Sequence, residues 1–428
     1  QEVIDRTINY AQNSSEYWIT GRGWDQTTWT MQGAVTNTRL NIFLPDRPVF
    51  IKRVDGHAGL ANAKALALAG ITPDTEVAGG TIGVMGGRLT GLLTDNAMEL
   101  VERVIPLPSR AGQISALLKA QENCIAAGLT AVTDAGLDLS TILLIDSLHK
   151  TGDLKIRVYA MANPNEENFE YFEKNGAIST DLLQVSSFKI YADGALGSRG
   201  AKLKAPYCDH ENHTGVWVTE PKQIDALCAR IRAINFQANT HAIGDSANSL
   251  VLRTYAKHLS EGNDERWRIE HAQVVSLEDR EYFEKYSILP SVQPTHATSD
   301  MGWAHLRLCD DRMQGAYAYK SLLALNGYLP LGTDFPVENI SPLETFYSAV
   351  YRKNNNHKPV NGFRIQEALT PQQALLGMTL WAAKANRMDD KIGSLSVGKT
   401  ADYTVLDKDI LLDQYVLNAK VLHTHLVQ

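Results

Sequence analysis

The distribution of hydrophobic residues divides the chain into three parts. From about residue 128 to residue 337, short runs rich in β-branched and aromatic residues alternate with amphipathic helical stretches. This alternation is typical of βα units and predicts a parallel sheet covered by helices. Seven strands are expected, within residues 129–136, 155–162, 186–194, 237–245, 267–273, 287–294 and 329–337.

Capping residues mark the starts of several intervening helices. Ser276, Ser341 and Thr370 each stand at a predicted N-cap. The first residues, QEVIDRTINYAQ, have the pattern of a helix that is already under way at Gln1.

The two ends of the chain follow different patterns. Residues 47–54 are a plausible strand, but the surrounding Gly- and Pro-rich stretches indicate an insertion, and residues 71–91 indicate a long, turn-rich surface excursion. After Ala385, short strands with glycine turns predict a small β appendage. A closed (β/α)8 barrel needs eight strands, so one is missing.

Composition and charge narrow the class of protein. The chain has 428 residues, 44% of them hydrophobic and 21% charged, which describes a globular protein that buries a core. Its formal net charge of -7 argues against nucleic acid or an anionic membrane as the main partner. There is no apolar run near the roughly 20 residues that a membrane helix needs. Gln1 does not begin a signal peptide, and an export signal can precede it, so cytoplasmic localisation is only the default.

The cysteines are widely separated. Cys124, Cys208, Cys228 and Cys309 form no CxxC pair, so neither a disulfide framework nor a thiolate zinc site is predicted. A reducing compartment is compatible with this pattern.

Four of the predicted strands carry a polar residue close to their carboxyl ends: Lys189, His241, His271 and Asp334. In a parallel barrel these ends share one rim, where the chemistry is located. Imidazoles and a carboxylate suit zinc or a similar divalent ion, which lowers the pKa of bound water to about 7. Asp334 is then placed to accept the proton of that water.

Each of these residues also has a structural interpretation. A single histidine at a strand end is more often hydrogen-bonded than metal-bound, whereas two on adjacent strands favour ligands. Lys189 as a surface lysine conflicts with a strand that is buried on both faces. Asp334 can simply cap the turn before Pro336.

Other residues are candidates for the substrate pocket. His296 follows a strand that has no ligand of its own and can hydrogen-bond the scissile carbonyl or its oxyanion. Trp24, His57 and Arg199 are further candidates for substrate binding. His57 can instead begin the helix that follows it, and Trp24 with Trp29 can instead pack in the core.

Several motifs together resemble the amidohydrolase superfamily, specifically the YtcJ-like metal-dependent hydrolases that include N-substituted formamide deformylases. They are GRGWDQTTW, VDGHAGLANAKAL, SFKIYADGALGSRGA, NTHAIGDSA, RIEHAQ, SVQPTHATSD, GTDFPVENISPLE and the ending LTPQQALLGMTLWAAKANRM…IGSLSVGKTADYTVLD. The resemblance covers nearly the whole chain. It implies a TIM barrel at residues 111–385, an insertion subdomain at 1–110 before the second strand, and strands of a small β-sandwich at 386–428.

The resemblance also implies roles for the strand-end residues. Lys189 corresponds to the fourth-strand lysine, which in many such enzymes is carboxylated and bridges two metals. His241 and His271 correspond to the ligands of the fifth and sixth strands, and Asp334 to the eighth-strand ligand and proton shuttle. One or two divalent ions, zinc first among them, and a small-molecule amide substrate follow from the resemblance; self-association is left open.

The family places an HxH pair on the first strand, which is expected before Gln1. His423 and His425 have the same spacing, but they follow the appendage strands, so we assign them to the small sandwich rather than to a permuted barrel strand. Two functions remain: a hydrolase of carbon–nitrogen bonds that uses metal-activated water, and an inert scaffold or regulatory binding protein without the HxH strand.

Overall fold

A curled parallel sheet forms the centre of the molecule. The computed structural model describes residues 2–29, 33–412 and 416–427. Among them the strand order of the main sheet is β12-β11-β10-β9-β7-β6, and the short β8 pairs with β9. The strands are β6 (Ala131–Leu137), β7 (Arg157–Ala162), β8 (Ile178–Ser179), β9 (Leu183–Tyr191), β10 (Gln237–Ala242), β11 (Arg268–His271) and β12 (Leu289–Ser291).

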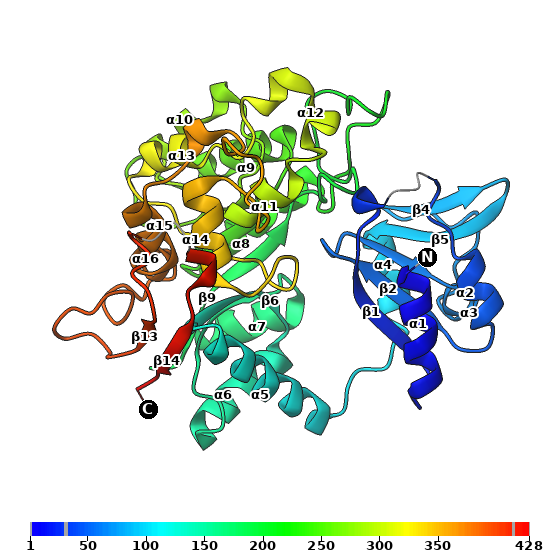
Figure 1. Cartoon of the computed structure of the whole chain (residues 1–428), viewed down its shortest axis with the longest axis horizontal. Coiled ribbons are helices and arrows are strands. Elements are labelled where there is room, and N and C mark those ends of the chain that lie inside the picture. Colours follow the sequence, from blue (N-terminus) through cyan, green and yellow to red (C-terminus); the bar gives the residue numbers. More distant parts are fainter. Residues whose placement is uncertain (1, 30–32, 413–415, 428) are drawn as a thin grey trace.

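Helices cover this sheet and continue beyond it (Figure 1). They are α5 (Arg110–Ala126), α6 (Leu139–Thr151), α7 (Glu166–Asn175), α8 (Pro221–Ala233), α9 (Asp245–His258), α10 (Glu281–Lys285), α11 (Pro294–Asp300), α12 (Ala304–Met313), α13 (Tyr319–Asn326), α14 (Pro342–Tyr351), α15 (Pro371–Met378) and α16 (Leu380–Ala385). The 3-10 turns are η2 (Leu277–Asp279) and η3 (Ile365–Glu367). Every residue of β7 and β10 is buried, as expected for parallel strands with helices on the outside.

The sheet is a half-barrel. Along the path of described strands, β6 and β12 are the two ends. Six of the seven predicted strands are present, but the seventh, at residues 329–337, is reduced to a single parallel bridge between Leu331 and Val292. The bridge lies next to β12, so this segment occupies the expected position without a continuous hydrogen-bond ladder.

Local capping explains where several helices begin. The Ser341 side chain accepts from the Glu344 backbone N–H at the start of α14. Thr370 and Gln373 form a complete capping box at α15. Ser276 stands at the N-cap of η2 as predicted, but its side chain makes no capping hydrogen bond.

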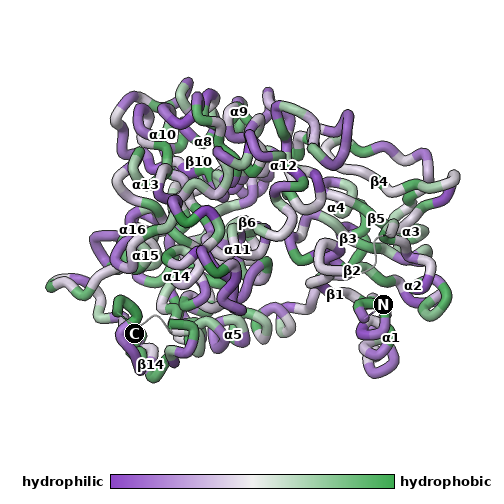
Figure 2. The backbone as a smooth tube through the Cα atoms, turned by 45° about the horizontal axis from the view of Figure 1, so that its top comes forward, coloured by the Kyte–Doolittle hydropathy of each residue, from purple (hydrophilic) through white to green (hydrophobic). Residues whose placement is uncertain are grey.

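The N-terminal unit has its own mixed sheet, with strand order β1-β2-β3-β5-β4. It contains α1 (Glu2–Asn13), β1 (Ile19–Trp24), η1 (Gln26–Thr28), α2 (Thr38–Phe43), β2 (Val49–Arg53), β3 (Ala58–Ala61), α3 (Ala63–Leu68), β4 (Gly80–Met85), β5 (Arg88–Asp95) and α4 (Asn96–Glu102). The unit lies to one side of the barrel, and α1 is largely hydrophilic (Figures 1 and 2).

One prediction about this unit was wrong in part. Residues 71–91 lie largely at the surface, as predicted, but they are not an irregular excursion, because β4 and the start of β5 form a hairpin there. Gly86 and Gly87 connect the two strands at φ 58° and 73°. Glycine tolerates this left-handed conformation, so the glycine-rich pattern marked a tight hairpin turn.

The C-terminal residues form a two-stranded antiparallel sheet of β13 (Tyr403–Leu406) and β14 (Val421–His425), with η4 (Val416–Asn418) before β14. Thr424 Oγ1 donates to the Ile125 carbonyl in the last turn of α5, and Thr404 Oγ1 donates to the Gly128 carbonyl just after it, which fixes this sheet against the barrel. His423 and His425 lie on β14, as predicted for the appendage.

A disulfide that the sequence did not predict joins two loops of the barrel. Cys208, in the connection between β9 and α8, is bonded to Cys309 in α12, and their Cα atoms are 5.9 Å apart. They are 101 residues apart in sequence, and spacing gives no information about such a contact. Cys124 and Cys228 are free and buried. No described helix has the length and apolar character needed to cross a membrane.

Candidate metal and active site

The carboxyl ends of the parallel strands bring the predicted ligands to one mouth of the half-barrel. Lys189 lies on β9, His241 on β10 and His271 at the end of β11. Asp334 follows the bridge at Leu331. The rings of His241 and His271 have centroids 4.6 Å apart.

Three side chains come close enough to hold one metal ion. A ligand atom from each of His271, His296 and Asp334 lies within 4.8 Å of the other two. His296 Nε2 is 3.7 Å from Asp334 Oδ2 and 4.0 Å from Glu338 Oε1. His271 and Asp334 were predicted as ligands, whereas His296 was predicted to contact the substrate.

The hydrogen bonding of the two histidines leaves a nitrogen of each available to bind a cation. His296 Nε2 is buried and has no hydrogen-bond partner, which is costly unless another group binds it. His271 Nδ1 is 2.7 Å from Gln293 Oε1, so this amide can fix the ring and leave Nε2 as a ligand atom. Two imidazoles and a carboxylate are an ordinary ligand set for a divalent metal such as zinc.

Electrostatics favour the neutral imidazoles. Burial lowers the pKa of His296, and burial together with the charge of Lys189 lowers the pKa of His271 well below its ordinary value. Neutral imidazole is the form that binds metal. Burial raises the pKa of Asp334 to about 6, although the Lys189 charge opposes this shift.

His241 lies beside this group and is held by the loop after β9. Its Nε2 is 3.4 Å from the Gly194 carbonyl oxygen and 3.6 Å from Asp193 Oδ1. Asp193 is fully buried and accepts backbone N–H bonds from Lys202, Ile243 and Gly244. Asp193 therefore ties the ends of β9 and β10 together beside the His241 ring.

Lys189 is buried at the same mouth. Its Nζ lies 4.9 Å from the centroid of the Tyr191 ring, and within the described part of the chain it forms no ion pair or hydrogen bond. Burial lowers the pKa of Lys189, although the carboxylates of Glu270 and Asp334 oppose this. A buried, unpaired lysine is costly unless it has a function.

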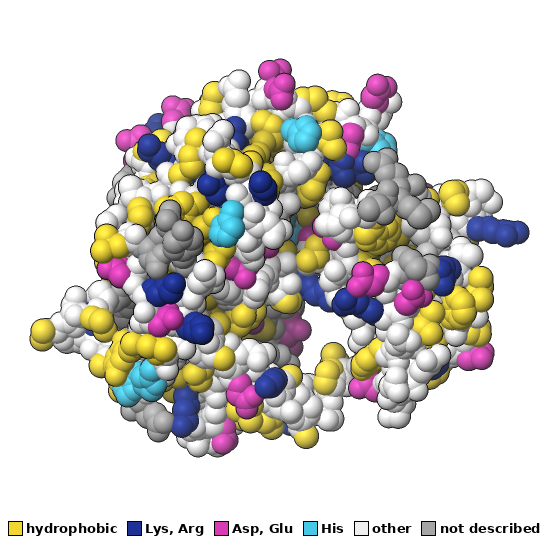
Figure 3. Space-filling model, in the orientation of Figure 1, with side chains coloured by type: hydrophobic (Ala, Val, Ile, Leu, Met, Phe, Trp, Pro, Cys, Tyr) yellow, Lys and Arg dark blue, Asp and Glu magenta, His cyan; other side chains and the backbone are white. Residues whose placement is uncertain are grey.

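The N-terminal unit adds His57 to this mouth. The centroid of the His57 ring lies 5.0 Å from that of His241, and Nδ1 is 2.8 Å from Asp95 Oδ1. Burial lowers the pKa of His57, but the hydrogen bond to Asp95 and nearby carboxylates outweigh it and raise the pKa overall. The surface is hollowed between the N-terminal unit and the barrel (Figure 3).

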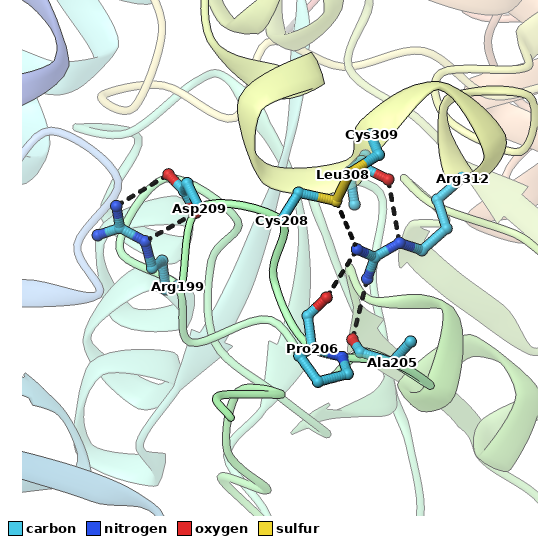
Figure 4. The surroundings of a disulfide bond; sticks show 8 residues. All are labelled: Arg199, Ala205, Pro206, Cys208, Asp209, Leu308, Cys309 and Arg312. Carbon is cyan, nitrogen blue, oxygen red and sulfur yellow. Dashed lines mark hydrogen bonds and ion pairs between the residues drawn. A yellow bond between two sulfur atoms is a disulfide. The ribbon is translucent and has the colours of Figure 1, made fainter. Parts of the chain in front are cut away.

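The other two predicted substrate residues, Arg199 and Trp24, make contacts with other protein groups. Arg199 makes a two-pronged ion pair with Asp209, at 3.1 and 2.9 Å, next to the disulfide (Figure 4). Trp24 is buried in the N-terminal unit, where its Nε1 donates to the Ile51 carbonyl, and it lines an apolar pocket of that unit with Trp29.

Sequence reasoning missed Asp95, Asp193 and Gln293, which hold His57, His241 and His271. Asp193 lies four residues after Lys189 within KIYADG, so its place at a strand end was a usable signal. Gln293 follows β12 in the same way. Asp95 gave no such signal, because it is separated from His57 by 38 residues and belongs to a sheet outside the barrel.

Known proteins resemble this chain over most of its length. A model of the amidohydrolase family (Amidohydro_3) matches residues 1–414. "Protein LONG AFTER FAR-RED 3" of Arabidopsis thaliana is 32% identical over 413 residues, which cover 92% of this chain and 70% of that protein. "Putative amidohydrolase YtcJ" of Bacillus subtilis is 32% identical over 399 residues, covering 92% and 75%. "N-substituted formamide deformylase" of Arthrobacter pascens is 25% identical over 427 residues, covering 95% and 77%.

Solved structures support the same grouping. An uncharacterised metal-dependent hydrolase from Pyrococcus horikoshii superposes with a TM-score of 0.77 and 27% identity, covering 99% of this chain and 82% of that chain. Another from Pyrococcus furiosus gives a TM-score of 0.73 and 25% identity, covering 95% and 81%. This chain therefore belongs to the amidohydrolase family, among its metal-dependent hydrolases.

Proposed function

We propose that this protein hydrolyses the carbon–nitrogen bond of a small-molecule amide, with an N-formyl or N-acyl amide as substrate. The observation that carries the proposal is the convergence of His271, His296 and Asp334 at the barrel mouth. The resemblance to a protein named as a formamide deformylase supports the substrate class.

His271, His296 and Asp334 would hold a divalent metal, zinc first among the candidates, with Lys189 and His241 beside them as further ligands. When bound, such an ion acts as a Lewis acid toward a carbonyl and acidifies water. The proposal extends to a carboxylated Lys189. Its support is that burial lowers the pKa of this lysine and so favours the neutral amine, which is the form that adds carbon dioxide.

Asp334 is proposed to move the proton. Its carboxylate can take the proton of the attacking water and return it to the leaving nitrogen, so that the products are a carboxylic acid and an amine. Burial gives Asp334 a pKa of about 6, close to neutrality, where a group can both accept and release a proton.

Metal analysis and amide hydrolysis test this proposal. Purified protein is stripped with chelator, reloaded with zinc and assayed on a panel of N-formyl and N-acyl amides. We expect bound metal and metal-dependent hydrolysis. Replacing His271 or His296 by Ala should remove bound metal, and Asp334→Asn should lower kcat by about 100-fold or more.

The matched control is His258→Ala, because His258 is a similarly sheltered histidine on α9 that pairs with Asp225 outside the site. It should retain metal and activity. Protein that binds no metal and hydrolyses none of the amides would contradict the proposal and favour the inert scaffold or regulatory protein.

A further inference from the structure

The register of the N-terminal sheet builds a histidine–carboxylate pair. Ala58 on β3 is paired with Thr94 on β5, which sets His57 opposite Asp95. The Asp95 backbone N–H donates to the His57 carbonyl at 3.1 Å, and their side chains meet at 2.8 Å. The pair is therefore fixed by the backbone as well as by its own hydrogen bond.

A loop of the barrel packs against Asp95. Its side chain is 1% exposed, and Oδ2 is buried without a hydrogen-bond partner. Gly194 and Gly200, from the loop after β9, pack against this carboxylate: a Cβ added to Gly194 would overlap Oδ1, and one added to Gly200 would lie 2.7 Å from Oδ2. The loop that follows Lys189 thus accommodates the carboxylate only with glycine at these positions.

The His57 ring extends the row of imidazoles at the mouth. It neighbours His241, which neighbours His271, which lies 5.7 Å from His296 between ring centroids. With Nδ1 bonded to Asp95, Nε2 is the remaining nitrogen, and it makes no hydrogen bond to any residue that the structure describes. The His57 side chain is 17% exposed, so a ligand can reach the ring.

The protonation of His57 Nε2 determines which kind of substrate group it can bind. In the neutral ring, Nδ1–H donates to Asp95 Oδ1, and this sets the tautomer in which Nε2 carries a lone pair. That lone pair accepts a hydrogen bond. In an amide substrate, the donor next to the scissile bond is the amide N–H.

We propose that His57 is a substrate-contacting catalytic residue that accepts a hydrogen bond from the N–H of the scissile amide, and that Asp95 positions its ring. The inference rests on the proposed function and narrows it to amides that retain an N–H. It also makes the N-terminal unit a part of the active site.

Paired substrates test this role. A secondary amide and its N-methylated tertiary analogue are compared in zinc-loaded wild-type protein and in His57→Ala. We expect kcat/KM for the secondary amide to fall by about 10-fold to 100-fold, because one hydrogen bond to a buried partner is lost. The tertiary amide, which has no N–H to donate, should change by less than about 3-fold, and the metal content should be unchanged.

Three further variants test the positioning by Asp95. Asp95→Asn should shift the ring nitrogen resonances of His57 in ¹⁵N spectra, because it changes the partner of Nδ1. It should also reproduce the selective loss on the secondary amide, which a purely structural role would not predict. Gly194→Ala should do the same by displacing the carboxylate, whereas Gly302→Ala, where an added Cβ meets nothing within 4 Å, should not. His258→Ala again serves as the control histidine.

The outcomes separate the two proposals. Wild-type protein that hydrolyses no amide in a metal-dependent way contradicts the proposed function. Wild-type hydrolysis with equal losses on both substrates in His57→Ala, with no loss on either, or with loss of bound metal, overturns only the role assigned to His57.

Discussion

Several side chains of the candidate site have backbone conformations that are unusual for their residue types. His271, Asp334 and Asp95 have φ values of 76°, 55° and 48°. A residue with a Cβ is strained there by about 1–3 kcal/mol, and such residues cluster at functional sites. Two of these residues are candidate metal ligands and the third is the partner of His57. Other described residues outside the site, such as Arg266 and Arg387, also have positive φ, so such conformations are not confined to the mouth.

A half-buried carboxyl group, that of Asp300, makes stability depend on pH. Burial raises the pKa of Asp300 from 3.8 to about 8, although its hydrogen bond from Tyr317 Oη, at 2.8 Å, opposes the shift. The folded protein therefore holds a proton that the unfolded chain has lost across this interval. The stabilisation is complete below the unfolded pKa and disappears as pH rises through the folded value.

We expect Asp300→Asn to flatten the pH dependence of unfolding. Between pH 5 and pH 7 the wild-type free energy of unfolding should fall more steeply than that of the variant, by roughly 1.4 kcal/mol per pH unit for one proton. Urea unfolding of the metal-free proteins at several pH values measures both slopes. Equal slopes would show that Asp300 does not retain its proton in this range.

At the scale of elements, the barrel strands could be predicted and their partners outside the barrel could not. Lys189, His241, His271 and Asp334 could be grouped because parallel strands place their carboxyl ends at one edge. The prediction of the segment around Asp334 as a full strand was wrong, because only Leu331 forms a bridge there. A strand-like composition predicts that a segment is extended and buried. Whether it forms a continuous hydrogen-bond ladder depends on the adjacent strand, which its own composition does not describe.

Contacts between separate strands and loops leave no periodic pattern of hydrophobic residues in the sequence. His57 and Asp95 meet through the register of β3 and β5, within a region whose glycines indicated surface turns. Cys208 and Cys309 meet because the connection after β9 packs against α12. Hydrophobic periodicity predicts each helix or strand separately, and it does not predict contacts between residues of different elements.

Asn62 shows how one side chain joins several elements of the N-terminal unit. It is fully buried at the N-cap of α3. Its Oδ1 accepts from the backbone N–H groups of Val49 and Ala65, and its Nδ2 donates to the carbonyls of Leu44 and Arg47. All four hydrogen-bonding positions of the amide are therefore used.

Asn62→Ala should destabilise the protein by about 2–4 kcal/mol, because the mutation leaves several buried backbone groups unpaired. Asn9→Ala, at an exposed position of α1, is the matched control and should change stability by less than about 0.5 kcal/mol. Chemical denaturation of both variants makes the comparison. Similar stability losses in the two would show that the Asn62 network contributes little.

At the scale of the whole molecule, the mouth is assembled from parts that are distant in sequence. The N-terminal unit supplies His57, the strand ends supply Lys189, His241 and His271, and the segments after β12 supply His296 and Asp334. Asn96 Nδ2, next to Asp95, also donates to the Val218 carbonyl of the loop after β9. Site geometry therefore depends on how firmly the loops around the mouth are held.

The disulfide holds two of these loops. It joins the connection that follows Lys189 to α12, which comes directly after the helix of His296. Arg312 reinforces the junction by donating to the carbonyls of Ala205 and Pro206 and to Cys208 Sγ (Figure 4). Both sides of the mouth are thus bonded to each other away from the candidate ligands.

Breaking this bond should destabilise the protein as a whole. A disulfide that closes a long loop restricts the unfolded chain, and for the separation of 101 residues the effect is up to about 4 kcal/mol. The double variant Cys208→Ser, Cys309→Ser should therefore unfold at lower urea concentration than wild type. Reductant should lower the wild-type midpoint toward that of the variant and leave the variant unchanged, because Cys124 and Cys228 are already free thiols. A reductant effect of equal size on both proteins would mean that the bond does not stabilise the fold, and that Arg312 and the packing of α12 suffice to hold the mouth together.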